Sequence, residues 1–230
     1  MNVHSTCMPP TIVPPQGQPK RGVETRMSIA PQHEPCTRER VVEAARQLFA
    51  SRGFHQTAMS DLAETAGVSV GAIYRLFKGK AEIIQFIVES DSQLRISEIQ
   101  TLADQVRSRS LPIRAALTQM MVLSLSEKNE ALSFEILAEA HRNDAVACTI
   151  TDMCRHFRGA FRCLAEAVNP QLTALQLDAA EELLLACAFG LGHRNLSAPR
   201  LGIADTTESA AQMIYAALNL QVSDPPTAGA

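Results

Sequence analysis

The fold is decided by residues 37–80, which read TRERVVEAARQLFASRGFHQTAMSDLAETAGVSVGAIYRLFKGK. Apolar residues at the start of this stretch recur at steps of three and four, a spacing that places them on one face of a helix. They are Val41, Val42, Ala45, Leu48 and Phe49. Thr37 stands where an N-cap belongs, and Gly53 interrupts the pattern. The stretch therefore predicts an amphipathic helix between Thr37 and Gly53.

Two shorter helices follow, separated by a turn that contains glycine. The second helix, over 57–66, has an inner face made by Met59, Leu62, Ala63 and Ala66. The turn is Ala66-Gly67-Val68-Ser69, and Ser69 can cap a third helix that runs through Phe77. Two helices joined in this way let one helix enter the DNA major groove while its neighbour crosses the backbone. The sequence thus predicts a helix-turn-helix.

The third helix is the predicted DNA reader. Ala72, Ile73, Leu76 and Phe77 are apolar enough to seat it, which leaves its other face exposed. On that face Gly71 permits close backbone approach, and Tyr74 and Arg75 can reach phosphates or base edges. Arg38, Thr57 and Lys80 are added as phosphate contacts near the helix starts. The predicted DNA-binding residues are Arg38, Thr57, Ser69, Val70, Gly71, Tyr74, Arg75 and Lys80.

Charge is distributed unevenly along the chain. The formal net charge is −3, yet residues 37–80 carry seven basic and four acidic side chains, a balance of +3. Residues 1–36 carry +1, and the rest of the chain carries −7. Positive potential is therefore confined to one small region, which opposes a protein that coats DNA without specificity.

The quoted segment resembles the N-terminal domain of TetR-family regulators. The similarity rests on TRERVVEAARQLFASRGF, followed by the TAM, DLA, AGVS, GAIYRLF and KAEII segments, over about 50 residues between Thr37 and Ile84. The resemblance implies an all-α subunit of nine or ten helices, DNA binding by the first three, and a divergent ligand-binding core. Two positions depart from the family pattern. Ala58 stands where a hydroxyl residue is common, and Leu76 where His or Tyr is common.

The remainder of the chain is also predicted to be helical. A long helix begins at Lys80, and further helices are predicted over 113–126, 131–141, 145–168, 178–194 and 207–220. No segment alternates well enough to predict a strand. The predicted fold is all-α, with a three-helix DNA-binding domain over 37–80 and a helical ligand-binding and dimerisation domain over 81–222. A short disordered tail, 223–230, ends the chain.

The first 36 residues are predicted to be a disordered leader, since they hold seven of the twelve prolines and show no apolar periodicity. We consider the hypothesis that translation begins at Met27. The alternative is a weakly basic arm in which Lys20, Arg21 and Arg26 touch phosphates.

A ligand pocket is predicted around the stripe of apolar residues on 145–168. In the resembled family this helix often lines the effector cavity, although the same stripe is equally typical of a core. The predicted pocket residues are Met120, Phe134, Leu137, His141, Met153, Phe157 and Phe161. Glu135, Glu139 and Arg142 are polar groups that could orient a ligand, or could simply be solvated. The resemblance also implies that the last two long helices form the dimer interface, with Leu184, Cys187, Ala188, Met213 and Ala217.

Several other classes find no support in the sequence. There is no nucleophile and base pair, phosphate loop or metal-ligand spacing, so we predict neither an enzyme nor a cofactor. The cysteines contain no CxxC pair and are interpreted as free thiols of a cytoplasmic protein. No apolar run is long enough for a membrane helix.

The predicted function is a homodimeric transcriptional repressor that a small molecule releases from a near-palindromic operator. An activator or dual regulator, or a helical ligand-binding protein that has lost DNA binding, are the alternatives.

Overall fold

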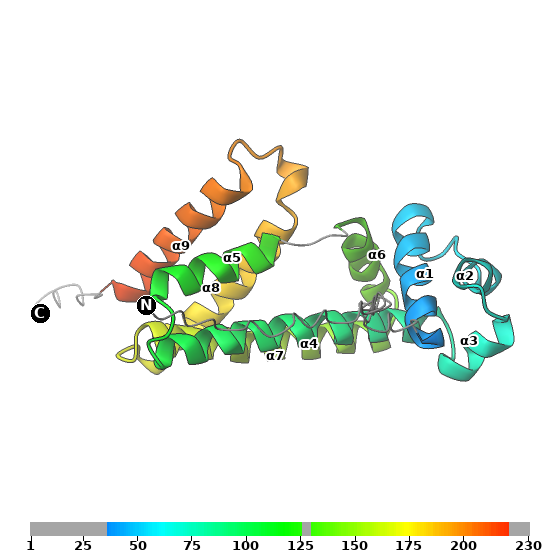
Figure 1. Ribbon diagram of the computed structural model, residues 1–230, viewed down its shortest axis with the longest axis horizontal. Coiled ribbons are helices and arrows are strands. Elements are labelled where there is room, and N and C mark those ends of the chain that lie inside the picture. Colours follow the sequence, from blue (N-terminus) through cyan, green and yellow to red (C-terminus); the bar gives the residue numbers. More distant parts are fainter. Residues whose placement is uncertain (1–35, 126–129, 221–230) are drawn as a thin grey trace, which may run out of the picture. The chain divides into compact units, whose positions relative to one another are not determined.

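The computed structural model describes residues 36–125 and 130–220, and all regular elements in these ranges are helices (Figure 1). This confirms the predicted all-α fold. The elements are α1 (Thr37–Arg52), α2 (Met59–Ala66), α3 (Val70–Leu76), α4 (Lys80–Arg107), α5 (Ile113–Leu125), α6 (Glu130–Ala140), α7 (Asp144–Val168), α8 (Ala174–Gly192), the 3₁₀ helix η1 (Arg194–Ser197) and α9 (Ile203–Asn219). The predicted leader up to Pro35, the hypothesis on Met27 and the predicted tail fall outside the described residues.

Most helix boundaries lie within a few residues of their predicted positions, and the differences have local causes. Thr37 is the first helical residue of α1 and not its N-cap, which is Cys36. The α8 helix begins four residues earlier than predicted, because Thr173 and Gln176 form a reciprocal capping box at its start. The α9 helix likewise begins early, at Ile203, with Asp205 in its first turn.

Two apolar clusters hold the helices together. The first joins α1, α2, α3 and the start of α4, and it is filled by Phe49, Leu62, Ile73 and other fully buried side chains. Leu132 of α6 and Val146 of α7 belong to the same cluster. The second cluster joins the end of α4 with α5, α7, α8 and α9. The first cluster therefore extends beyond the predicted boundary at residue 80.

The α4 and α7 helices pack along each other and connect the two clusters (Figure 1). The α6 helix contacts both α1 and α7, while α5 packs on α8 and α9. This arrangement makes α6 the element of the C-terminal region that touches α1 most extensively. The α6 helix is therefore in direct contact with α1, the first helix of the N-terminal domain.

Within residues 36–125 and 130–220, none of the helices combines the length and the apolar character needed to cross a bilayer.

Candidate nucleic-acid interface and effector pocket

The turn between α2 and α3 has the geometry that the sequence predicts. Gly67 ends α2 in the left-handed region, with φ of 63° and ψ of 40°, and the Val68 amide donates to the Ala63 carbonyl at 2.9 Å. Ser69 then caps α3, because its Oγ accepts from the Ala72 amide at 3.1 Å. Arg40 of α1 fastens the turn by donating from Nη2 to the Gly67 carbonyl at 2.9 Å. No pattern in the sequence predicts this contact from α1.

One face of α3 is free for a partner. Its exposed residues are the five predicted DNA readers Ser69, Val70, Gly71, Tyr74 and Arg75. The Tyr74 side chain is 54% exposed, whereas Ile73 on the opposite face is fully buried. No Cβ contact within 4 Å would arise at Gly71, so the backbone there is open to close approach. The structure thus gathers these five residues on a single surface.

The other three predicted DNA contacts are engaged within the protein. Lys80 Nζ donates to the carbonyls of Phe54 and Thr57 at 2.6 and 2.8 Å, and it lies 4.6 Å from the centre of the Phe54 ring. The Thr57 hydroxyl is buried and donates to the Gly53 carbonyl at 2.8 Å. Through these hydrogen bonds, the side chains of Lys80 and Thr57 hold the loop between α1 and α2 in place. A phosphate contact by either remains a prediction.

Burial of the Lys80 ammonium group lowers its pKa, and the nearby negative charge of Glu139 partly opposes that shift.

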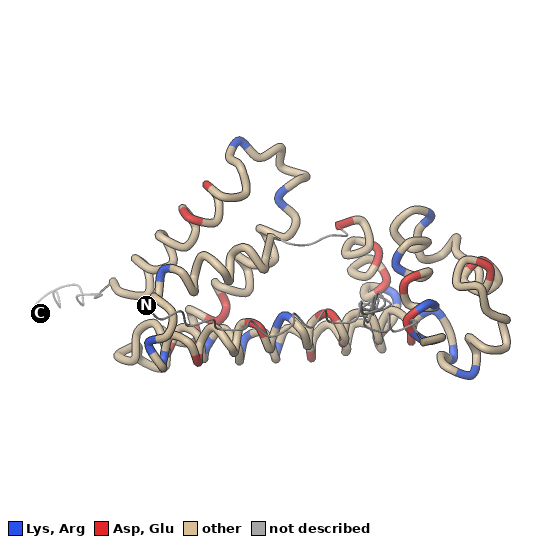
Figure 2. The backbone as a smooth tube through the Cα atoms, viewed as in Figure 1, with Lys and Arg blue, Asp and Glu red and all other residues tan. Residues whose placement is uncertain are grey.

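The Arg38 guanidinium lies 5.2 Å from the ring centres of both Phe77 and Phe86, a cation–π arrangement that orients it. Figure 2 marks the basic and acidic positions along these helices. A phosphate contact by Arg38 also remains a prediction.

Two carboxylates of α6 meet the loop between α1 and α2. Glu135 Oε2 accepts from the Phe54 amide at 2.8 Å. The buried Glu139 carboxylate lies 3.3 Å from His55 Nε2, to which Arg142 is also linked at 3.1 Å. The sequence suggests these polar residues as ligand-orienting groups, but the structure places them against Phe54 and His55, in the loop between α1 and α2. Their spacing of four residues on a helix is the available signal that they share one face.

A cavity of about 500 Å³ is lined mainly by α4, α6, α7 and α8, and also by Arg46 of α1 and by Leu123 and Ser124 of α5. Of the predicted pocket residues, Leu137, Met153, Phe157 and Phe161 line it. The other three are not in the lining. Met120 of α5 is buried in the second apolar cluster, the Phe134 ring is tilted against the ring of His193 at 4.9 Å, and His141 is exposed in the turn after α6. Four of the seven predicted residues therefore line this cavity, and α8 contributes further lining residues that the sequence prediction did not include.

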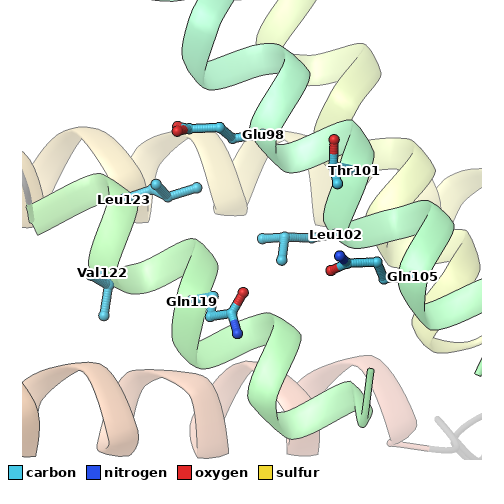
Figure 3. Close-up of a pocket in the computed structure, with 7 residues that line it drawn as sticks. All are labelled: Glu98, Thr101, Leu102, Gln105, Gln119, Val122 and Leu123. Carbon is cyan, nitrogen blue, oxygen red and sulfur yellow. The ribbon is translucent and has the colours of Figure 1, made fainter. Parts of the chain in front are cut away.

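Cys154 is half-buried in the wall of this cavity, and burial raises the pKa of its thiol while Arg158 partly opposes the rise. A smaller hollow of about 360 Å³ lies between α4 and α5 (Figure 3). Thr101, Gln119 and Val122 of its lining are exposed, so we interpret it as a surface groove.

The predicted dimer residues divide into two groups. Cys187, Met213 and Ala217 are exposed, with Met213 73% accessible. Leu184, in contrast, is buried in the core of its own subunit, and Ala188 lines the cavity. The large exposed apolar residues of α8 that the sequence prediction did not include are Leu175, Leu183 and Phe189. Among the described residues, no three metal-ligating side chains are grouped to hold an ion.

Residues 41–86 match the sequence profile of the family described as bacterial regulatory proteins, tetR family. The chain thus carries the helix-turn-helix domain of the TetR family. Among curated relatives, the regulator UidR of Escherichia coli (strain K12) is 27% identical over 117 residues, which cover 50% of this chain and 57% of UidR. The regulator TtgR of Pseudomonas putida is 46% identical over 54 residues, or 24% of this chain and 26% of TtgR.

The similarity to these relatives extends over little more than half of their length at most. Fold similarity reaches further. The transcriptional regulator FadR from Bacillus subtilis, solved in complex with stearoyl-CoA, has a TM-score of 0.60 at 16% identity and covers 77% of this chain and 97% of its own. The TetR-family domain is therefore followed by a helical C-terminal region with the arrangement seen in such regulators.

Proposed function

We propose that the chain is a dimeric transcriptional regulator that binds a near-palindromic operator through α3 and is released from it by a small molecule. The observation that carries the DNA-binding part is the exposed face of α3, where Val70, Tyr74 and Arg75 stand on a helix whose opposite face is buried. A short helix seated in this way fits the major groove. Val70 supplies an apolar contact for a thymine methyl group, and Arg75 a charged one.

Dimerisation is supported by the exposed apolar side chains of α8 and α9. Leu183 is 64% exposed and Met213 is 73% exposed. Large apolar residues exposed on two consecutive helices are typical of an interface. A second subunit would bring a second α3 to the same DNA, which matches a palindromic operator with half-sites about one helical turn apart.

Ligand control is supported by the position of α6. Its Leu137 side lines the cavity, whereas Glu135 contacts the loop that precedes α2. The FadR structure, solved with stearoyl-CoA, indicates that this fold can hold a ligand. A molecule in the cavity would change operator affinity only if it bound the two arrangements of α6 with different affinity. Release from DNA, and hence repression, is the outcome we propose.

The DNA-binding part is tested by titrating labelled genomic fragments that the full chain retains, at several salt concentrations. We expect Arg75→Ala to weaken binding by about tenfold or more and to reduce the salt slope by about one. Arg155→Ala, which removes an exposed arginine on α7, is the matched control and should bind as the wild type does. Absence of any retained fragment, with a folded dimer, would favour a helical ligand-binding protein instead.

A further inference from the structure

The charged groups that line the cavity are already paired. Arg46 holds Asp91 through two hydrogen bonds of 2.6 Å, and Glu182 Oε2 lies 3.0 Å from Arg158 Nε. The charged residues of the described lining are Arg46, Asp91, Arg95 and Glu182, two of each sign, and Arg95 is engaged by the protein too. A charged ligand entering the cavity would therefore lose its hydration without gaining an unpaired counter-charge.

One polar pair in the lining has its hydrogen-bond direction fixed by its neighbours. His193 Nδ1 is 2.8 Å from the Phe189 carbonyl, which can only accept, so Nδ1 carries the proton. In the neutral imidazole Nε2 is then an acceptor, and the Ser133 hydroxyl, 2.9 Å away, must donate to it. The lone pairs of Ser133 Oγ remain, so the pair offers the cavity a hydrogen-bond acceptor.

Aromatic rings lie beside this acceptor. The Phe189 and His193 rings have centroids 4.5 Å apart, and Phe157 and Phe161 stack at 6.0 Å on α7. Phe157, Phe161, Phe189 and His193 all line the cavity. Such rings favour an aromatic ligand that contacts them with its face or edge.

We propose that the effector is an uncharged, largely apolar molecule that carries an aromatic ring and a hydroxyl group, and that this hydroxyl donates to Ser133 Oγ. The proposal deepens the proposed function, because it names the chemistry of the molecule that fills the cavity. Binding itself can be measured without DNA, so the two proposals can fail separately.

The test compares three probes of similar shape by calorimetry with the full chain at neutral pH. They are 4-phenylphenol, its methyl ether 4-methoxybiphenyl, and biphenyl-4-carboxylate. We expect the phenol to bind most tightly and the ether about three- to tenfold more weakly, because the ether has no donor. The carboxylate should bind at least about 30-fold more weakly than the phenol. Equal affinity for the phenol and the ether, or a preference for the carboxylate, would overturn the proposal.

The place of binding is read from cysteine alkylation followed by peptide mass spectrometry. Cys154 lies in the cavity wall, whereas Cys148, on the same helix, is exposed and outside it. Bound 4-phenylphenol should slow modification of Cys154 and leave that of Cys148 unchanged. Calorimetric saturation without protection of Cys154 would place the probe elsewhere and contradict the proposal.

Ser133→Ala should abolish the preference for the phenol over the ether while binding the ether as the wild type does. The matched control is Ser97→Ala, whose hydroxyl donates to the Leu94 carbonyl on the exposed side of α4. An unchanged preference in Ser133→Ala would overturn the assignment of the acceptor. If 4-phenylphenol binds as expected but leaves operator affinity unchanged, the ligand chemistry is supported and the proposed release from DNA fails.

Discussion

At the scale of single residues, two nearby glycines have opposite requirements. Gly67 has φ of 63°, and a Cβ added there would lie 2.7 Å from Arg40 Nη2. Gly71 lies in α3, and a Cβ there would meet nothing within 4 Å. The turn therefore depends on the first glycine for its backbone conformation, whereas the second is needed only if a partner approaches α3 closely.

Gly67→Ala should lower the free energy of unfolding by about 1–2 kcal/mol, because an alanine in the left-handed region is strained. Gly71→Ala is the control and should raise it by about 0.5–1 kcal/mol through better helix propensity. Urea unfolding measures both changes. Gly71→Ala should nevertheless weaken DNA binding; a variant that is both more stable and fully active in binding would contradict close approach at this position.

Cys154 makes stability depend on pH. Burial keeps its thiol protonated in the folded chain above 9.0, the ordinary pKa, where the unfolded chain loses that proton. The sign follows from linkage: this contribution to stability is present below 9.0 and is lost as the pH rises through the raised, folded pKa. Alkylation of Cys154 should accordingly accelerate at a higher pH in the folded chain than in the chain unfolded by urea. Coincident pH profiles of Cys154 in the two states would contradict this expectation.

At the scale of elements, α6 is a helix that both lines the cavity and contacts the loop between α1 and α2. Ile136 and Leu137 line the cavity, while Glu135 accepts from the Phe54 amide and Glu139 lies beside His55. These contacts are short and partly buried, so a rotation or translation of α6 cannot leave the loop between α1 and α2 unchanged. Under the proposed function, these contacts on both sides of α6 are the route by which a ligand would affect DNA binding.

Glu135→Ala should reduce this coupling while leaving the cavity intact. Coupling between two sites commonly changes affinity by about 5–150-fold, and we expect the variant to retain about threefold or less. The measurement is operator affinity with and without a saturating probe, with probe binding checked by calorimetry. Glu89→Ala, which removes an exposed carboxylate on α4, should retain full coupling. Undiminished coupling in Glu135→Ala would exclude this contact as the route.

The helices and the helix-turn-helix could be predicted from the sequence because their signals are local. Apolar spacing, Gly67 and the Ser69 cap act within a few residues of one another. The contacts missed were those between distant segments. Arg40 with Gly67 spans 27 residues, and Glu135 with Phe54 spans 81, and no periodicity encodes such pairs. For the same reason the sequence did not reveal that Lys80 and Thr57 turn inward, or that His193 reaches Ser133.

At the scale of the whole molecule, the exposed apolar side chains of α8 and α9 support the proposed dimer. Leu183 and Met213 are both largely accessible in the single subunit. Charge favours DNA binding by the N-terminal helices, because the net charge of −7 beyond residue 80 disfavours contact between DNA and the rest of the chain.

The double variant Leu183→Glu and Met213→Glu should convert the dimer to a monomer, since it places four charges in a two-fold interface. Analytical ultracentrifugation measures the change, and operator binding should fall by about 100-fold or more because only one half-site is then held. Leu94→Glu is the control, because Leu94 is equally apolar and 63% exposed but lies on α4. A double variant that stays dimeric would show that another surface joins the subunits.

Footprinting of the full chain on the genomic fragments that it retains tests the central claim most directly. Two protected half-sites should appear, related by two-fold symmetry and about one helical turn apart. At the protein concentration that just saturates the wild-type footprint, Tyr74→Ala and Arg75→Ala, both on the exposed face of α3, should lose that protection without loss of fold or dimer. Uniform protection along any DNA, or half-sites that persist in both variants, would contradict the assignment of α3 as the helix that reads DNA.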